Sequence, residues 1–346
     1  MAWLEEELLE QPGALRRFLD RRSDFVRSFA PDVLRDGDVR YLVIASRGSS
    51  SNAARYAQYL LGGANRLPIA FAAPSLYTLY DASPRLDGAF AVGISQSGRS
   101  PDVTAVIEEA RRQGRPTLAI TNDEESPLAQ AAELVLPLEA GDERAVAATK
   151  TYLNSLAAVA LLSATLAGDD IRLAQLQRIP GQVEEQLARS LSDTTLVDRY
   201  RTARGATVVA RGLNYGTAFE IALKIRELSG LLVEAYSPAD LLHGPIAGIA
   251  PGWPVLVVAP SGPSLESVAE IVGRVRARGA RVLAISDDPA LLRQVDTPLP
   301  LVSGVPEWLS PLVAAIPGQV AALRLAALRG LDVDRPAGLT KVTLTR

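Results

Sequence analysis

The sequence predicts an α/β protein built from two tandem copies of one domain, each a parallel sheet flanked by helices. In both halves, short apolar runs of strand length alternate with segments of helical periodicity, which is typical of parallel sheets covered on both faces. Four separated segments of the first half recur in the second half at a shift of about 165 residues. The length of 346 residues is enough for two domains of ordinary size.

The chain begins with a predicted helical arm over residues 1–37. Apolar side chains recur in this arm at helical spacing, with an expected break at Pro12 and Gly13. We expect the arm to pack on the body of the protein or on a partner subunit.

The first predicted sheet follows the arm. Its first two strands each lead through a loop rich in serine and glycine into a helix. The predicted strands cover residues 39–45, 89–94, 117–121 and 134–138. The loops cover residues 46–52 and 95–100, and the helices cover residues 53–61 and 101–113.

The second half repeats these segments. Residues 43–48, 92–98, 111–114 and 118–123 match residues 207–212, 257–262, 276–279 and 283–288. Agreement at four places with a single shift predicts a duplicated domain. The expected boundaries are a helical arm over 1–37, a first domain over 38–165, a helical linker over 166–200, a second domain over 201–330, and a tail over 331–346.

Composition excludes several classes of function. The net charge is −3, with 36 basic and 39 acidic residues interspersed, so we expect neither a nucleic-acid partner nor a membrane partner. There is no cysteine and one histidine, which argues against disulfides, thiolate nucleophiles and a metal site. The N-terminus does not have the pattern of a signal peptide. We expect a cytoplasmic protein whose partners are small molecules or other protein chains.

A stripe of charge stands out in the second half. Glu220, Lys224 and Glu227 are spaced to share one face of a helix, and apolar residues flank them on both sides. The same spacing is common in solvated salt-bridge ladders, so a surface role and a semi-buried catalytic role both remain open here. His243, the only histidine, follows in a turn before Gly244 and is either structural or catalytic.

The serine-rich loops occur in the first half, whereas the stripe occurs in the second. Ser100 suits the N-cap of a helix whose first residue is Pro101, and Ser49 and Ser50 lie in the neighbouring loop. Hydroxyls and free N–H groups at a helix start suit a phosphate monoester, although ordinary capping would use the same residues. The loops match neither a Walker loop nor the dinucleotide pattern, so no cofactor is expected.

The motifs, taken in order, resemble the sugar isomerase (SIS) domain family, specifically the isomerase portion of glucosamine-6-phosphate synthase and its stand-alone relatives. The resemblance covers nearly the whole chain and implies two tandem SIS domains, each a flavodoxin-like three-layer sandwich. It rests on LEQPGALRRFL, SRGSSSNAA, GISQSGRSPD, ERAVAATKTYLNSL, FEIALKIRELSGLLVEAYSPADLLHGP and the tail over residues 332–343.

The resemblance also implies roles for single residues. It implies that the sugar phosphate is held by Ser49, Ser50, Ser95, Gln96, Ser97 and Ser100, and that the segment around Val146 closes on the sugar. It implies that Glu227 moves a proton between C1 and C2, with Glu220 and Lys224 in support. His243 would open the sugar ring from a neighbouring subunit of a homodimer, and Lys341 would contact the open-chain sugar.

We expect an isomerising deaminase that converts glucosamine 6-phosphate and water to fructose 6-phosphate and ammonia. The glutaminase domain of the synthase uses a cysteine nucleophile, which this chain does not contain, so glutamine-dependent synthesis by this chain is not expected. Arg47, Arg99 and the Ser100 to Asp102 segment depart from the synthase pattern toward the stand-alone enzymes. Alternatives are another phosphosugar isomerase, a sugar-amine 6-phosphate deglycase, or a non-catalytic sugar-phosphate-binding regulator.

Overall fold

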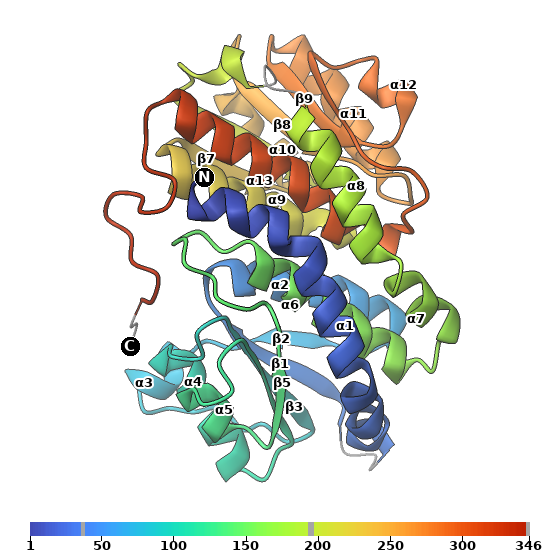
Figure 1. The fold of residues 1–346 in the computed structure, drawn as a ribbon, viewed down its shortest axis with the longest axis vertical. Helices are drawn as coiled ribbons and strands as arrows, with labels where there is room; N and C mark the ends of the chain where they lie inside the picture. Colours follow the sequence, from blue (N-terminus) through green and yellow to red (C-terminus); the bar gives the residue numbers. More distant parts are fainter. Residues whose placement is uncertain (36–38, 193–196, 344–346) are drawn as a thin grey trace. The chain divides into compact units, whose positions relative to one another are not determined.

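The protein divides into two compact units, each with one sheet. The structure is a computed structural model that describes residues 1–35, 39–192 and 197–343 (Figure 1). The first-sheet unit contains Glu10–Glu143, Lys150–Arg178 and Thr340–Arg346. The second-sheet unit contains Met1–Leu9, Arg144–Thr149 and Ile179–Leu339.

The first sheet has five parallel strands among the described residues, in the order β2-β1-β3-β4-β5. The four strands predicted from apolar runs are present, and one was not predicted. That strand, β2, has three residues and is partly exposed, so it carries little apolar signal. The strands are β1 (Tyr41–Ser46), β2 (Ile69–Phe71), β3 (Ala89–Ser95), β4 (Thr117–Thr121) and β5 (Leu134–Pro137).

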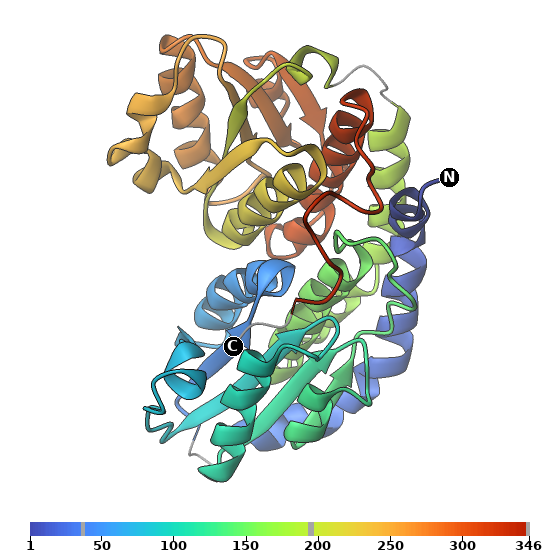
Figure 2. The same ribbon diagram turned by 90° about the vertical axis from the view of Figure 1, so that its left-hand side faces the viewer.

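Helices cover both faces of this sheet (Figures 1 and 2). One core cluster joins apolar residues of β1, β3 and β4 to the inner faces of α4 and α5, while α2 packs against α6. Helix α6 is buried along nearly its whole length, which explains its Ala-rich and Leu-rich sequence. The helices are α2 (Gly48–Ala64), α3 (Ser75–Thr78), α4 (Pro101–Arg112), α5 (Pro127–Ala131), α6 (Lys150–Leu166) and α7 (Asp170–Leu176).

The second sheet repeats the first. Its order, β10-β9-β8-β6-β7, is the order of the first sheet read from the other edge. The central pairing also recurs, since Ile44 lies opposite Val92 and Val208 opposite Leu256. This is the doubly wound order of flavodoxin-like folds, and it confirms two tandem α/β domains. The strands are β6 (Gly205–Ala210), β7 (Leu232–Tyr236), β8 (Pro254–Val258), β9 (Arg281–Ser286) and β10 (Thr297–Pro300).

The helices of the second-sheet unit also form two layers. A core cluster packs α10, α11 and α12 against β6, β8 and β9, and α9 packs along α13. The approach of α9 to α13 is close, because a Cβ added at Gly318 would lie 2.4 Å from Ile221. The helices are α8 (Ile179–Ser192), α9 (Tyr215–Ser229), α10 (Pro238–Leu242), α11 (Leu265–Ala277), α12 (Pro289–Leu292) and α13 (Ser310–Leu328).

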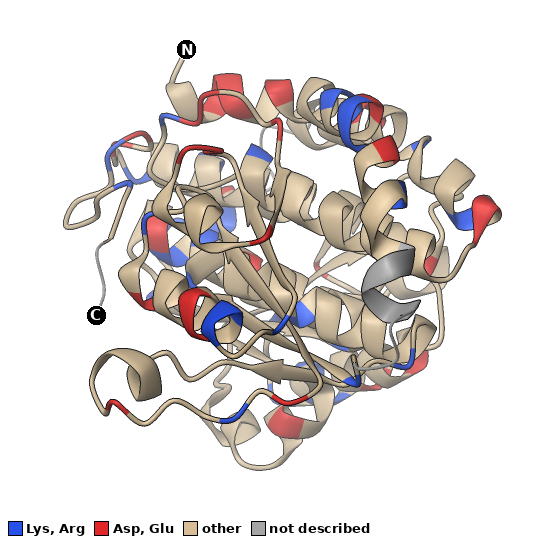
Figure 3. Cartoon of the chain, turned by 90° about the horizontal axis from the view of Figure 1, so that it is seen from below, with Lys and Arg blue, Asp and Glu red and all other residues tan. Residues whose placement is uncertain are grey.

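One segment of the described chain, Glu307–Leu328, is long and apolar enough to cross a membrane by length and composition. Of its most apolar stretch, 83% is buried inside the protein, which accounts for its composition as that of a core helix. In Figure 3, basic and acidic residues are mixed along the described helices and loops.

The predicted break in the N-terminal arm is wrong. Helix α1 (Trp3–Arg35) runs continuously through Pro12 and Gly13, and residues 36–37 of the predicted arm lie outside the described residues. A proline inside a helix removes one hydrogen bond, but packing offsets that loss here. The buried apolar face of α1 continues on both sides of the proline, with Leu4, Leu8, Ala14, Leu15, Phe18 and Leu19.

The start of α1 is held by the C-terminal tail. Asp334 accepts hydrogen bonds from the backbone N–H groups of Trp3 (3.0 Å) and Leu4 (2.9 Å). The guanidinium groups of Arg144 and Arg335 each lie 5.1 Å from the centre of the Trp3 ring, a cation–π distance. The tail residues next to Asp334 are therefore fixed to the first turn of the chain.

Candidate active site

The charged stripe of α9 is buried. The side chains of Glu220 and Lys224 are 0% and 2% exposed, and that of Glu227 is 22% exposed. The Lys224 Nζ lies 2.5 Å from Glu227 Oε2 and 3.7 Å from Glu220 Oε1. Buried charged groups are stable only when they are paired, and here one ammonium is placed to pair with both carboxylates. This geometry overturns the alternative of a solvated surface ladder.

The polar stripe extends farther toward the start of α9 than its sequence spacing had indicated. Asn214 and Thr217 are buried, at three-residue steps before Glu220. Asn214 Nδ2 donates a 2.7 Å hydrogen bond to Ser310 Oγ at the start of α13. Neither residue was singled out from the sequence, although extending the helical spacing backward from Glu220 would have included both.

His243 directly follows a short helix. Helix α9 ends at Ser229 and is followed by Gly230, whose φ of +68° forms a left-handed cap, and β7 then leads to α10, which ends at Leu242. His243 is exposed, and its backbone N–H donates to the carbonyls of Ala239 and Asp240. The expected turn is present.

A tyrosine lies between the stripe and this histidine along the chain. Tyr236, at the end of β7, donates a 2.6 Å hydrogen bond to the Glu234 carboxylate. That bond, more than burial, raises the pKa of the Tyr236 hydroxyl to about 12. The hydroxyl is therefore a hydrogen-bond donor and not a base near neutral pH.

The loop after β3 has the geometry of an anion site. Gly98, at φ +60°, turns the chain between the strand and α4, and Ser100 and Pro101 take the predicted N-cap and first helical positions. The Ser100 side chain makes no capping hydrogen bond, so ordinary capping does not account for its hydroxyl. Ser95 Oγ accepts from the Gly98 N–H at 3.2 Å, and Ser97 Oγ accepts from the Arg99 N–H at 3.3 Å.

The loop after β1 is shorter than predicted. Helix α2 begins at Gly48 rather than at residue 53, so Ser49 and Ser50 belong to its first turn and not to a loop. Glycine at φ +51° allows the helix to start directly after the strand. Since β1 and β3 are neighbouring parallel strands, the starts of α2 and α4 lie at the same edge of the first sheet.

Two further predicted residues, Val146 and Lys341, take part in contacts between the tail and the segment around Glu143 and Val146. The half-buried Val146 donates its backbone N–H to the Asp334 carbonyl at 3.2 Å. Lys341 Nζ lies 2.9 Å from Glu143 Oε2, and the Glu143 side chain is fully buried. That carboxylate also accepts from the N–H and hydroxyl of Thr151, at 3.1 Å and 2.8 Å, in the first turn of α6. Glu143 was missed because its partner lies 198 residues away.

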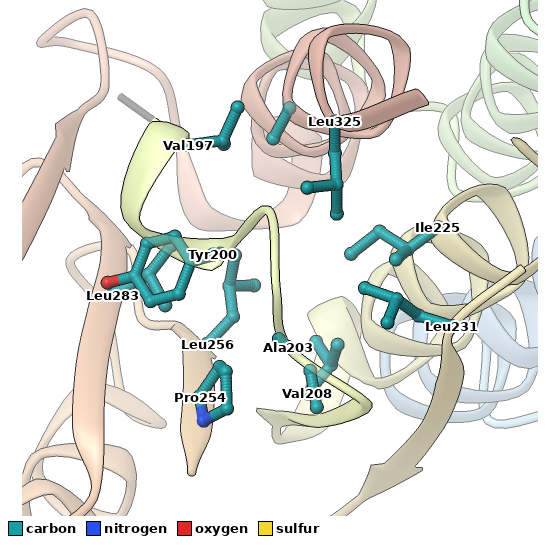
Figure 4. Close-up of a pocket in the computed structure, with 12 residues that line it drawn as sticks. Val197, Tyr200, Ala203, Val208, Ile225, Leu231, Pro254, Leu256, Leu283 and Leu325 are labelled. Atoms are coloured by element: carbon teal, nitrogen blue, oxygen red, sulfur yellow. The ribbon is translucent and has the colours of Figure 1, made fainter. Parts of the chain in front are cut away.

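One pocket of the second-sheet unit is not part of the candidate active site. It is a cavity of about 40 Å³ between the sheet, α9 and α13 (Figure 4). Apart from the Tyr200 ring, aliphatic residues such as Ile225, Leu256 and Leu325 line it, and it contains no charged group. A sugar phosphate needs polar partners, which this cavity does not offer.

The fold and these groups together define an α/β protein with a duplicated doubly wound domain, serine-lined helix starts in one copy and a buried charge cluster in the other. Residues 36–164 and 200–329 each match the SIS domain model. The chain belongs to the SIS domain family.

Curated relatives with similar sequences are much longer than this chain. It is 34% identical to glutamine–fructose-6-phosphate aminotransferase [isomerizing] of Thermus thermophilus, over 98% of this chain and 58% of that protein. It is 31% identical to the protein of the same name from Thermococcus kodakarensis, over 97% of this chain and 57% of that protein. The chain therefore spans somewhat more than half the length of these relatives.

Solved structures cover the chain more fully. A protein from Silicibacter pomeroyi DSS-3, provisionally assigned as a phosphosugar isomerase, has a TM-score of 0.85 and 32% identity over 96% of this chain and 100% of that chain. The C-terminal domain of glucosamine-fructose-6-phosphate aminotransferase from Francisella tularensis has a TM-score of 0.85 and 26% identity over 97% and 98%. A glucosamine-6-phosphate deaminase from Thermotoga maritima, at 22% identity over 99% and 100%, shares the fold with a TM-score of 0.81.

Proposed function

We propose that this chain is a phosphosugar isomerase that acts on an amino-sugar phosphate and releases ammonia, with glucosamine 6-phosphate as substrate and fructose 6-phosphate as product. The buried Glu220, Lys224 and Glu227 cluster carries the proposal, because it supplies a base and a cation in one place. Similarity to the isomerase portions of the aminotransferases supports the same chemistry.

In the proposed reaction, Glu227 removes the proton from C2 of the open-chain sugar and returns it to C1. The electron pair of the broken C–H bond passes through an enediol-type intermediate, whose developing charge Lys224 stabilises. A proton also passes from the C2 amine to O1, so the product has a hydroxyl at C1 and an imine at C2. Water adds to that carbon and ammonia leaves, which gives the ketose phosphate with no net oxidation or reduction. Glu227 is partly exposed and so has access to a substrate, whereas the Glu220 side chain is fully buried.

Other residues are proposed to bind and orient the substrate. The phosphate would be held at the starts of α2 and α4, where the first helical turns place backbone N–H groups and serine hydroxyls at one edge of the first sheet. The Ser100 hydroxyl makes no capping hydrogen bond to α4, which supports this assignment. The proposed phosphate ligands are Ser49, Ser50, Ser95, Gln96, Ser97 and Ser100.

We also propose that Lys341 contacts the open-chain sugar and that Val146 lies in the segment that closes on it. The tail carrying Lys341 is held by Glu143, and the carbonyl of Asp334 engages the Val146 N–H. The proposed reaction needs no glutamine, because water displaces the ammonia, and residues 1–346 contain no cysteine that could act as a glutaminase nucleophile. Neither a cofactor nor a metal has a place in this scheme.

A homodimer is part of the proposal, with His243 opening the sugar ring in the site of the neighbouring subunit. The imidazole is exposed at the end of α10, as a residue donated to another chain would be. Mixing His243→Ala and Glu227→Gln subunits tests this point. Recovery of activity in the mixture is the expected result, and a mixture as inactive as its parents would refute the shared site. The enzyme is proposed to act in the cytoplasm.

The decisive assay couples ammonia release to fructose 6-phosphate formation with purified protein. The parent protein should release both products in equal amounts from glucosamine 6-phosphate. Glu227→Gln should lose most of the rate, while its affinity for fructose 6-phosphate should change little, because the amide keeps the shape but cannot accept the proton. Equal rates for the two proteins, or no ammonia from the parent, would reject the proposal.

The second candidate is a phosphosugar aldose–ketose isomerase that releases no ammonia. The similarity to the Silicibacter pomeroyi protein favours it. A panel of phosphorylated amino sugars, plain hexose phosphates and fructosamine 6-phosphate adducts separates this activity from a deaminase and from a deglycase. Binding without turnover on every member would instead identify a regulator.

A further inference from the structure

An arginine and a buried carboxylate join the two helix starts of the first-sheet unit. Arg47 is the residue before α2, and Asp102 is the second residue of α4. Arg47 Nε and Nη2 lie 2.7 Å and 2.6 Å from Asp102 Oδ2. The Asp102 side chain is fully buried, whereas the Arg47 side chain is half exposed.

Asp102 has a local structural role that does not require Arg47. Its Oδ1 accepts a 2.9 Å hydrogen bond from the Val103 N–H, and a carboxylate in a first helical turn interacts favourably with the helix dipole. The same negative charge, however, lies two residues from Ser100 in the loop proposed to bind a phosphate. Like charges at short range in a poorly solvated place repel strongly, so this site needs a cation.

The second domain provides an internal comparison. Arg211 has the same place before the helix that follows β6, with φ and ψ of −137° and 158° against −137° and 161° for Arg47. Arg211 Nη1 donates to a neutral partner, Ser267 Oγ, at 2.8 Å. Glu266, which matches Asp102 in the duplicated sequence, is exposed. The arginine recurs in both copies, and it faces a buried carboxylate in the copy with the serine-lined helix starts.

We propose that Arg47 is a positioning residue for the sugar phosphate that acts through Asp102: it neutralises the buried carboxylate beside the helix starts. The ion pair cancels the charge that would repel the anion held by Ser49, Ser50 and Ser100. The inference rests on the proposed function, since it assumes that these serines hold the phosphate.

The test measures binding of fructose 6-phosphate and of inorganic phosphate by calorimetry in four proteins. These are the parent, Arg47→Met, Asp102→Asn and the double variant. Arg47→Met should weaken binding of both ligands at least 10-fold, because it leaves a buried negative charge beside the phosphate. Asp102→Asn should bind as tightly as the parent or more tightly, and the double variant should recover most of the loss in Arg47→Met.

A purely structural ion pair predicts a different pattern. Asp102→Asn would then weaken binding as much as Arg47→Met, and the double variant would show no recovery; either result overturns the proposal. Arg85→Met is the matched control, since Arg85 pairs with the exposed Asp87 at 3.0 Å in the same unit, and its affinity should be unchanged. If Arg47→Met does not fold, Arg47→Lys, which keeps the charge but loses the two-bond geometry, should retain most of the phosphate affinity. A loss of 10-fold or more in Arg47→Lys would contradict neutralisation.

Binding is measured without turnover, so this test separates the two proposals. A parent protein that binds fructose 6-phosphate but releases no ammonia rejects the deaminase and leaves the role of Arg47 to be decided by the variants. A parent protein that binds neither phosphate ligand overturns the role of Arg47 as well.

Discussion

Replacing Lys224 by methionine should destabilise the second-sheet unit strongly. The ammonium is the cation shared by Glu220 and Glu227, and two of the three side chains are essentially inaccessible to water. Removing one partner of a buried ion pair costs about 3–5 kcal/mol, because the remaining charge stays desolvated. We therefore expect Lys224→Met to lower the free energy of unfolding by about that amount.

The cluster contains two carboxylates and one ammonium, which predicts an asymmetry among variants. Glu220→Gln leaves the 2.5 Å pair of Lys224 and Glu227 in place, so it should cost less than about 1 kcal/mol. Adding Glu220→Gln to Lys224→Met should recover about half of the loss, since the remaining carboxylate is partly hydrated. Arg226→Met, at an exposed position of the same helix, is the control and should change stability by less than about 0.5 kcal/mol.

Tryptophan fluorescence in urea suits this measurement. All three tryptophans, Trp3, Trp253 and Trp308, belong to the second-sheet unit, so the signal reports the unit that contains the cluster. A loss below about 1 kcal/mol in Lys224→Met would refute the reasoning, because it would mean that water reaches the carboxylates. Equal losses in Glu220→Gln and Lys224→Met would refute the assigned pairing.

Two other predictions concern the loop after β3 and the contact between Glu143 and Lys341. Gly98→Ala should abolish phosphate binding, because its Cβ would lie 2.0 Å from Ser126 Oγ on a backbone at φ +60°. Gly114→Ala is the control, because its backbone has φ +69° but no atom lies within 4 Å of the added Cβ. It tests backbone strain alone and should bind phosphate normally. Glu143→Gln should lower kcat at least 10-fold without raising KM much, by releasing the Lys341 ammonium from its 2.9 Å partner. In a Lys341→Ala background the same change should have little further effect on kcat, and additive losses would contradict a shared role.

Much of this architecture could be predicted from local sequence signals. The strands β1, β3, β4 and β5 are short apolar runs, and the duplication followed from repeated segments. The α9 stripe could be placed on one helical face because spacing fixes direction. The continuous α1 could not be predicted, because packing of its apolar face outweighs the local signal of Pro12 and Gly13.

Contacts between segments that are distant in the sequence could not be predicted from the spacing of residues. Arg47 and Asp102 are separated by 55 residues, and Glu143 and Lys341 by 198. The burial of Glu220 could not be predicted either, because helical spacing shows which residues share a face but not what packs against that face. The sequence therefore indicated the types of group in the site, while their pairing required the three-dimensional structure.

The cap that Asp334 provides for α1 has a consequence for synthesis of the chain. The carboxylate that accepts the Trp3 N–H is 331 residues downstream of it. At roughly 5–20 residues per second, the first turn of the protein waits on the order of 20–60 seconds before its capping residue is made. The 33-residue helix α1 is thus synthesised long before the residue that caps its first turn.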